Sequence, residues 1–217
     1  MNLSGRILIV SAVMLAFVSM ISAQNKWTVE MYGGIAGNVP MPLQVEQTGH
    51  PDLYFTAKYE SLSLANPIYY GFRIGKWLDN KSWELEFTHH KLYLSNNPPE
   101  IDYFSISHGL NMFTLNRGVA LSGFQFRGGA GPVIFHPEFK IRNVSYDPDG
   151  GLFHMGYLMN GVVLNVGVGH PIKLSNRFFF NLEVKTTFAY VRIQQDDLKV
   201  NAYNWAFHLI LGPGYSF

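Results

Sequence analysis

The feature that most constrains this sequence is the spacing of its apolar residues. The final segment, AYNWAFHLILGPGYSF (202–217), places an aromatic or aliphatic side chain at nearly every second position. The segment WELEFTHHKLYL (83–94) begins with the same alternation. Successive side chains of a β-strand point to opposite faces, so this spacing predicts strands with one apolar and one polar face. After residue 23, no apolar run approaches the roughly 20 residues that a membrane-spanning helix needs.

The N-terminus has a different pattern. Arg6 is followed by an apolar run over residues 7–21, which ends in small residues at Ala23. A basic residue, an apolar run shorter than a bilayer span and a small-residue end are typical of a secretory signal peptide. We therefore expect residues 1–23 to be a signal peptide and residues 24–217 to form one exported domain.

Composition narrows the class of exported protein. Charged residues make up 14% of the chain, against about 25% in a typical soluble domain. Aromatic residues make up 15%, there are 21 glycines, and there is no cysteine to form a disulfide. Without the expected signal peptide, basic and acidic residues balance at 15 each, which gives no basis for binding nucleic acid. Low charge and many aromatics without a spanning helix predict a transmembrane β-barrel.

The alternating segments and the turn residues between them give the strand count. We expect strands over residues 27–37, 68–78, 83–94, 102–115, 120–135, 153–170, 177–193 and 202–217. Short turns at 79–82, 116–119 and 173–177 fall on one side, and the longest loops, 38–67 and 136–152, fall on the other. Transmembrane barrels show this asymmetry. The sequence therefore predicts an all-β, eight-stranded, antiparallel up-and-down transmembrane barrel, whose longer strands extend beyond the bilayer.

The polar faces of these strands form one set of residues. Its acids and bases number four and three, and the set comprises Glu30, Arg73, Glu84, Glu86, Gln125, Arg127, Asn165, Glu183, Lys185, Asn204 and His208. In a transmembrane barrel this set would fill the interior as a paired network. The alternative is a soluble lipocalin-like barrel, in which the polar set faces water and the apolar set surrounds a ligand. The low total charge favours the membrane barrel.

Polar residues interrupt the apolar face of segment 83–94 at His89 and Lys91. Pairing with the next strand around a tight loop would place His89 opposite Ser107 or His108. Ionisable residues on a lipid-facing surface are costly and are candidates for function. The alternative is a headgroup-level rim with no chemistry of its own.

A second polar group follows at the outer end of the predicted strand 120–135. His136 and Glu138 lie there, and His154 begins the next strand at the same height. Histidines with a carboxylate could bind a divalent metal or perform acid–base catalysis. Their spacing matches no established metal motif, so the sequence identifies neither a metal nor a cofactor.

Several segments together resemble one family. They are ELEFTHHKLYL (84–94), FSISHGLNMFTLN (104–116), HPE (136–138), NLEVKTTFAY (181–190) and the C-terminal strand ending in Phe217. They resemble the bacterial outer-membrane barrels grouped with lipid A oxidase, over roughly residues 69–217. The family oxidises the proximal glucosamine of lipid A with oxygen in the outer leaflet. Val184 stands where that family has a tyrosine, and His108 where some members have an aspartate.

The resemblance implies shared residues and partners. By position the shared residues are His89 or His90, Lys91, Tyr93, His108, Asn111, His136, Glu138, Glu183 and Lys185. A terminal phenylalanine in such barrels is read by the outer-membrane assembly machinery, which would place Phe217 on the periplasmic side. The implied lipid partner is lipid A in the bacterial outer membrane.

Two functions remain open at this point. In the first, the barrel binds or modifies lipid A or lipopolysaccharide. Its candidate catalytic residues are His89, His108, His136 and Glu138, and its candidate substrate-binding residues are Lys91, Tyr93, Asn111 and Arg142. In the second, the barrel is a non-catalytic structural or adhesion protein that acts through its outer loops. Whether the protein is an enzyme is not decided by the sequence.

Overall fold

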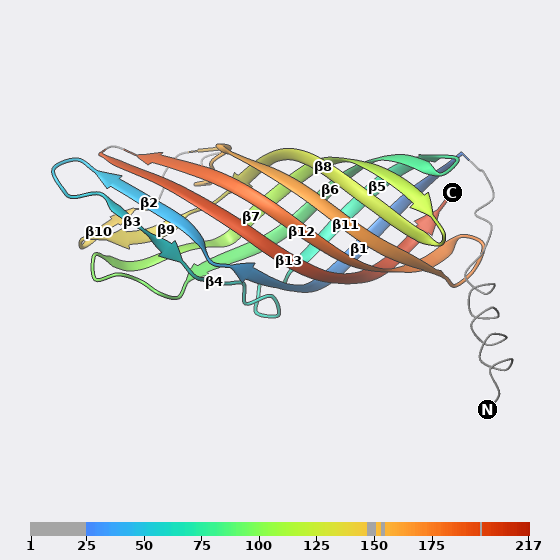
Figure 1. Cartoon of the computed structure of the whole chain (residues 1–217), viewed down its shortest axis with the longest axis horizontal. Helices are drawn as coiled ribbons and strands as arrows, with labels where there is room; N and C mark the ends of the chain where they lie inside the picture. Colours follow the sequence, from blue (N-terminus) through green and yellow to red (C-terminus); the bar gives the residue numbers. More distant parts are fainter. Residues whose placement is uncertain (1–24, 147–150, 153–154, 196) are drawn as a thin grey trace, which may run out of the picture.

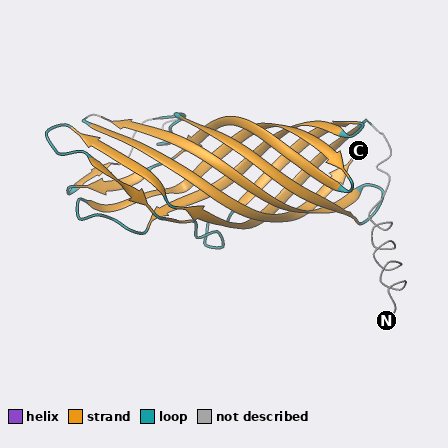
Figure 2. Ribbon diagram, viewed as in Figure 1, coloured by secondary structure: helices purple, strands orange, loops and turns teal. Residues whose placement is uncertain are grey.

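The computed structural model describes residues 25–146, 151–152, 155–195 and 197–217, so the expected signal peptide lies outside it. The described regular structure consists of strands (Figure 2). They are β1 (Lys26–Val39), β2 (Met41–Gln47), β3 (Leu53–Ala57), β4 (Tyr59–Glu60), β5 (Tyr70–Leu78), β6 (Lys81–Leu94), β7 (Ile101–Leu121), β8 (Phe124–Phe135), β9 (Glu138–Ile141), β10 (Val144–Tyr146), β11 (Gly161–Lys173), β12 (Phe178–Gln195) and β13 (Leu198–Ser216). None of the residues described forms a helix long and apolar enough to cross a membrane.

A closed barrel is formed by β1, β5, β6, β7, β8, β11, β12 and β13 (Figure 1). Each strand is antiparallel to the next along the chain, and β13 closes the barrel by pairing with β1, as in Val29 opposite Tyr215. Closure satisfies the backbone hydrogen-bonding groups of every wall strand, which a hydrocarbon environment requires. The predicted eight-stranded, antiparallel up-and-down barrel is confirmed.

The turn between β7 and β8 is not where the sequence predicted it. Residues 116–119 continue β7, and the turn is Ser122–Gly123, whose φ angles are 52° and 85°. Two central residues with positive φ give a tight hairpin whose twist matches that of the strands. The prediction took Gly118 for a turn residue. In the structure Gly118 lies within β7, where the lack of a side chain leaves room for the Ser82 hydroxyl of the adjacent strand β6. The predicted strand 153–170 also differs, since β11 starts at Gly161 and Phe153 is not described.

Charged side chains fill the half of the barrel interior nearest the C-terminus. All eleven residues of the predicted polar set are buried, which confirms that this set faces inward. Arg73 contacts Glu30, Glu86 and Glu183 at 3.0, 2.8 and 2.9 Å. Arg127 and Lys185 extend the network to Glu84 and Glu86 at 2.8 and 2.9 Å. Paired charges therefore occupy the interior, as expected for a barrel of this strand number.

The other half of the interior is apolar. The strands β7, β12 and β13 contain 21, 18 and 19 residues, longer than the roughly 9–11 that cross a bilayer. The hairpins β2–β3 and β9–β10 add to this end, opposite the C-terminus (Figure 1). Its core includes Leu43, Phe104, Phe139, Val191 and Val200. The barrel wall thus continues beyond the bilayer around a second, apolar core.

The outer surface of the wall is an apolar belt. Its exposed side chains include Val29, Met31, Phe72, Ile74, Trp83, Leu85, Phe113, Leu115, Phe126, Leu164, Val166, Val184, Phe207 and Leu209. These residues alternate along the strands with the buried charges, so apolar side chains face out and polar side chains face in. That orientation is the one of a transmembrane barrel, and it excludes the lipocalin-like alternative. The short turns mark the periplasmic end, and the hairpins β2–β3 and β9–β10 mark the outer end.

Candidate functional site at the outer rim

An irregularity in the wall marks the outer end of β6 and β7. Their pairing shifts between His90 and Leu92. Across this interval β6 contributes only Lys91, whereas β7 contributes residues 107–109. Gly109 has a φ of 118°, a conformation that L side chains rarely adopt. The additional residues of β7 form a β-bulge. Bulges commonly change the direction of side chains near functional sites.

The bulge changes the partner of His89. The structure pairs His89 with Asn111, so the predicted pairing with Ser107 or His108 is wrong. His89 Nδ1 lies 2.9 Å from Asn111 Oδ1, and the imidazole stacks on Tyr70 with ring centroids 5.0 Å apart. With the amide oxygen as acceptor, the proton sits on Nδ1. Within the described chain, Nε2 is buried and has no hydrogen-bond partner.

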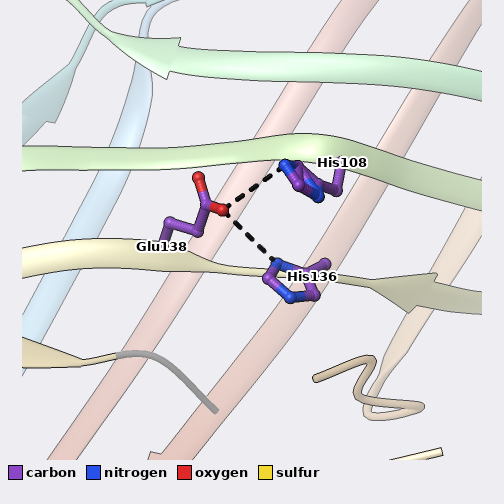
Figure 3. A group of neighbouring side chains, drawn as sticks. All are labelled: His108, His136 and Glu138. Atoms are coloured by element: carbon purple, nitrogen blue, oxygen red, sulfur yellow. Dashed lines mark ion pairs between the residues drawn. The ribbon is translucent and has the colours of Figure 1, made fainter. Parts of the chain in front are cut away.

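Three of the predicted catalytic residues meet beside the bulge. His108 comes from the bulge of β7, His136 from the connection between β8 and β9, and Glu138 from the start of β9 (Figure 3). Glu138 Oε1 lies 3.5 Å from His108 Nε2 and 4.0 Å from His136 Nδ1. The two imidazoles stack with centroids 4.9 Å apart. His108 is distant in sequence from His136 and Glu138, and the pairing of β7 with β9 brings the three residues together.

Neighbouring side chains hold this cluster in place. Ser107 Oγ donates to Glu138 Oε2 at 2.9 Å, which fixes the carboxylate. Tyr157 donates its hydroxyl to the backbone carbonyl of His108 at 3.1 Å and packs edge-on against His136 at 5.3 Å. The cluster is therefore supported by contacts from two separate segments of the chain.

A groove of about 600 Å³, here called the rim groove, lies on the outward face of β6 and β7. It is lined by Pro67, Tyr70, Phe87, His89, His108, Asn111, Phe113, Ile134, Leu152, Met155 and Tyr157. Phe87 and Phe113 belong to the same outward set as the apolar belt. The rim groove therefore opens on the lipid-facing side of the wall, with His89, His108 and Asn111 among its polar groups.

A second groove of about 550 Å³, here called the wall groove, shares Phe87 and Phe113 with the rim groove. It is shaped by β8, whose outward residues shrink from Phe124 and Phe126 to Gly128, Ala130 and Pro132. Ala130 and Pro132 line the groove together with aliphatic and aromatic side chains of β5, β6 and β7. The two grooves therefore adjoin at Phe87 and Phe113, one on the side of His89 and the other within the apolar belt.

Lys91 does not reach the headgroup region as the sequence predicted. The residue is 2% exposed, and its ammonium donates to the carbonyl of Ala65 at 2.9 Å. The loop between β4 and β5 covers it from outside. Tyr93 is half-buried, and its ring lies 5.7 Å from the Lys91 ammonium. Neither residue lines the rim groove.

Arg142 also has another role. It lies in the turn between β9 and β10 with a φ of 48°. Its guanidinium donates to Gln47 Oε1 at 2.9 Å and to the carbonyl of Pro51 at 2.6 Å. Arg142 therefore ties the β9–β10 hairpin to the β2–β3 hairpin, and it does not line the rim groove.

Positions implied only by the family resemblance lie on the inner face of the wall. Glu183 and Lys185 lie in the buried interior network, and His90 is buried with its Nε2 3.1 Å from Asn38 Oδ1. These residues cannot share a site with the outward-facing His89. His154, which the sequence placed at the same rim, lies outside the described residues.

Sequence reasoning missed the residues that shape the site. Tyr70 and Tyr157 were not singled out, and Ser107 was considered only as a pairing partner of His89, because their roles depend on contacts between distant segments. The bulge had a local signal, since His108–Gly109 interrupts the alternation of β7 with a polar residue and a glycine.

Comparisons with known proteins give a likeness of fold. No protein-family model matches the sequence, and no curated protein is significantly similar to it. Among solved structures, the outer membrane protein OprG from Pseudomonas aeruginosa is 14% identical over 90% of this chain and 97% of that chain, with a TM-score of 0.47. Outer membrane protein AlkL is 14% identical over 89% and 90%, with a TM-score of 0.49. The attachment invasion locus protein Ail of Yersinia pestis is 14% identical over 89% and 99%, with a TM-score of 0.38.

The resemblance to the lipid A oxidase-like family is not confirmed by these structures. The location of the protein follows from its own structure. A closed antiparallel barrel with an apolar outer belt and a charged network inside the belt is an outer-membrane β-barrel, and the protein belongs in the outer membrane of a bacterium.

Proposed function

We propose that this protein binds a lipid of the outer leaflet, with lipid A as the first candidate, and presents its headgroup to His89 and the His108–His136–Glu138 cluster. One observation carries the proposal: the polar groups at the rim line a groove on the lipid-facing side, and this groove shares Phe87 and Phe113 with a second groove in the apolar belt. A molecule that fits both parts needs acyl chains and a polar headgroup, as membrane lipids have.

The acyl part of the lipid would lie in the wall groove. Phe87 and Phe113 connect this groove to the rim, and Ala130 and Pro132 leave room beside them. Burying acyl chains here removes little surface from water, because the belt already contacts lipid. The wall groove would therefore select lipids by shape, through dispersion contacts.

The headgroup would meet the imidazoles of the rim. Histidine titrates near physiological pH and serves as a general acid or base when it is within hydrogen-bond reach of the reacting group. No lysine or arginine lines the rim groove within the described chain, so recognition there would rest on His89, His108 and Asn111. The resemblance to the lipid A oxidase-like family points to oxidation as the reaction.

Mass spectrometry of lipid A tests this proposal. Lipid A would be compared between cells that lack the gene and cells that produce the wild type, His89→Ala or His108→Ala. We expect a modified lipid A with the wild type only, with a gain of oxygen if the reaction is the one that the resemblance implies. His50→Ala, which changes an exposed histidine in the β2–β3 turn, should retain the modification. Identical lipid A in all strains would refute the enzymatic form of the proposal.

A structural or adhesion barrel is the second candidate, and one observation favours it. Arg142 ties the two outer hairpins together, and Lys199 bonds Glu46 at 2.8 Å between β13 and β2. The hairpins therefore form a braced outer surface. If this surface is the active part, replacing turn residues 48–52 should abolish a binding phenotype that His89→Ala leaves intact.

A further inference from the structure

We propose that His108, His136 and Glu138 bind one divalent transition-metal ion of the zinc class. One ligand atom from each residue lies within 4.8 Å of the other two. Ligand atoms around tetrahedral zinc are roughly 3.3 Å apart, for metal–ligand bonds of about 2.0–2.1 Å. The observed 3.5 and 4.0 Å separations from Glu138 Oε1 need only small side-chain rotations to reach that spacing. In Figure 3 the carboxylate points between the two imidazoles.

His136 supplies a second, independent observation. This residue is 9% exposed, and in the described chain its Nδ1 is buried with no hydrogen-bond partner. Buried polar atoms of side chains normally have a partner, because leaving one unpaired costs about 1–3 kcal/mol. This Nδ1 lies 4.0 Å from Glu138 Oε1, so a cation bound between the two atoms would satisfy it.

The donor set indicates the kind of metal. Two imidazole nitrogens and one carboxylate oxygen suit zinc and its neighbours in the first transition row. Calcium and magnesium take oxygen ligands and would find only one here. Three protein ligands leave a further coordination position open, as in catalytic metal sites.

The surroundings resemble the support that metal ligands usually have. The Ser107 hydroxyl bonds the second carboxylate oxygen of Glu138, and Tyr157 holds the backbone of His108. Such partners orient ligands, and their loss typically weakens metal binding about 10–100-fold. The cluster is also accessible, since the side chains of His108 and Glu138 are 58% and 34% exposed.

The metal site stands on these contacts whether or not a lipid occupies the grooves. If the proposed function also holds, the open coordination position would take a headgroup oxygen, because His108 lines the rim groove. A metal would then supply positive charge that no lysine or arginine of the groove provides.

Metal titration of the purified barrel tests the inference. The full chain, without a polyhistidine tag, would be stripped with EDTA in detergent and titrated with Zn²⁺, and with Co²⁺ followed by its visible absorption. We expect one ion per barrel. His136→Ala and Glu138→Gln should weaken binding at least about 100-fold, and Ser107→Ala about 10-fold.

Controls separate this result from folding and from lipid binding. Heat-modifiable mobility on gel electrophoresis shows that each variant is a folded barrel, and Glu138→Gln keeps the size of the side chain. His50→Ala should bind as the wild type does, and so should Ala130→Trp, which changes only the wall groove. Binding that is absent, or that survives both His136→Ala and Glu138→Gln in folded protein, would overturn the inference.

Discussion

Replacing Arg73 with methionine should strongly destabilise the barrel. Arg73 is 2% exposed and contacts Glu30, Glu86 and Glu183 at 3.0, 2.8 and 2.9 Å, with Glu84 at 3.7 Å. Without it, four buried carboxylates face two cations. Removing one partner from a buried ion pair costs about 3–5 kcal/mol, because the remaining charges stay desolvated and uncompensated. Methionine retains most of the volume, so the loss measures charge and hydrogen bonding.

Equilibrium urea unfolding in detergent or lipid vesicles, followed by tryptophan fluorescence, measures this loss. With an m-value of about 2 kcal/mol/M, a loss of about 4 kcal/mol lowers the unfolding midpoint by about 2 M. Arg117→Met is the matched control. Arg117 is exposed on the belt, with its guanidinium 5.0 Å from the centre of the Trp83 ring, a contact worth about 0.5–1 kcal/mol.

A double variant sharpens the same test. Arg73→Met combined with Glu183→Gln removes one of the uncompensated carboxylates, so it should be more stable than Arg73→Met alone. The reasoning is refuted if Arg73→Met costs no more than Arg117→Met, or if Glu183→Gln adds its full cost to that of Arg73→Met.

Three further results are expected from the rim and the outer core. Gly109→Ala should disrupt the pair of His89 and Asn111, because a Cβ there lies 2.6 Å from both side chains; lipid A modification should fall while the heat-modifiable band persists. Phe139→Ala should cost about 3–5 kcal/mol in urea unfolding, because Phe139 is fully buried against Phe104; a loss below about 1 kcal/mol would contradict the outer core. Metal affinity should fall on acidification from about pH 7.5 to about pH 5, because protons compete for the imidazole nitrogens; an unchanged affinity would contradict histidine ligation.

The architecture could be predicted from the sequence because it depends on alternation. Each wall strand repeats with period two, and the polar set from Glu30 to His208 lies inside as that period requires. The turn at 116–119 was predicted wrongly because a glycine in a strand and a glycine in a turn look alike in one sequence. Only the pairing of Ser82 with Gly118 shows which one it is.

The site could be predicted in part. The approach of His108, His136 and Glu138 follows from their common height at the outer end of neighbouring strands. The partner of His89 does not, because a bulge shifts the register and alternation alone gives no warning of its size. Nothing in the sequence indicated that Lys91 bonds the loop between β4 and β5, or that Arg142 bonds the β2–β3 hairpin. Such long-range contacts leave no periodic signal.

Native mass spectrometry of the barrel, extracted from outer membranes in mild detergent, tests the central claim most directly. The claim is that an outer-leaflet lipid occupies the joined rim and wall grooves. We predict that the wild type retains lipid A and that Ala130→Trp, which fills the wall groove, loses it. Leu164→Trp, which places the same side chain opposite Ala130 on β11 and outside the groove lining, should retain the lipid. Equal retention by all three proteins, or no retained lipid in the wild type, would contradict the account.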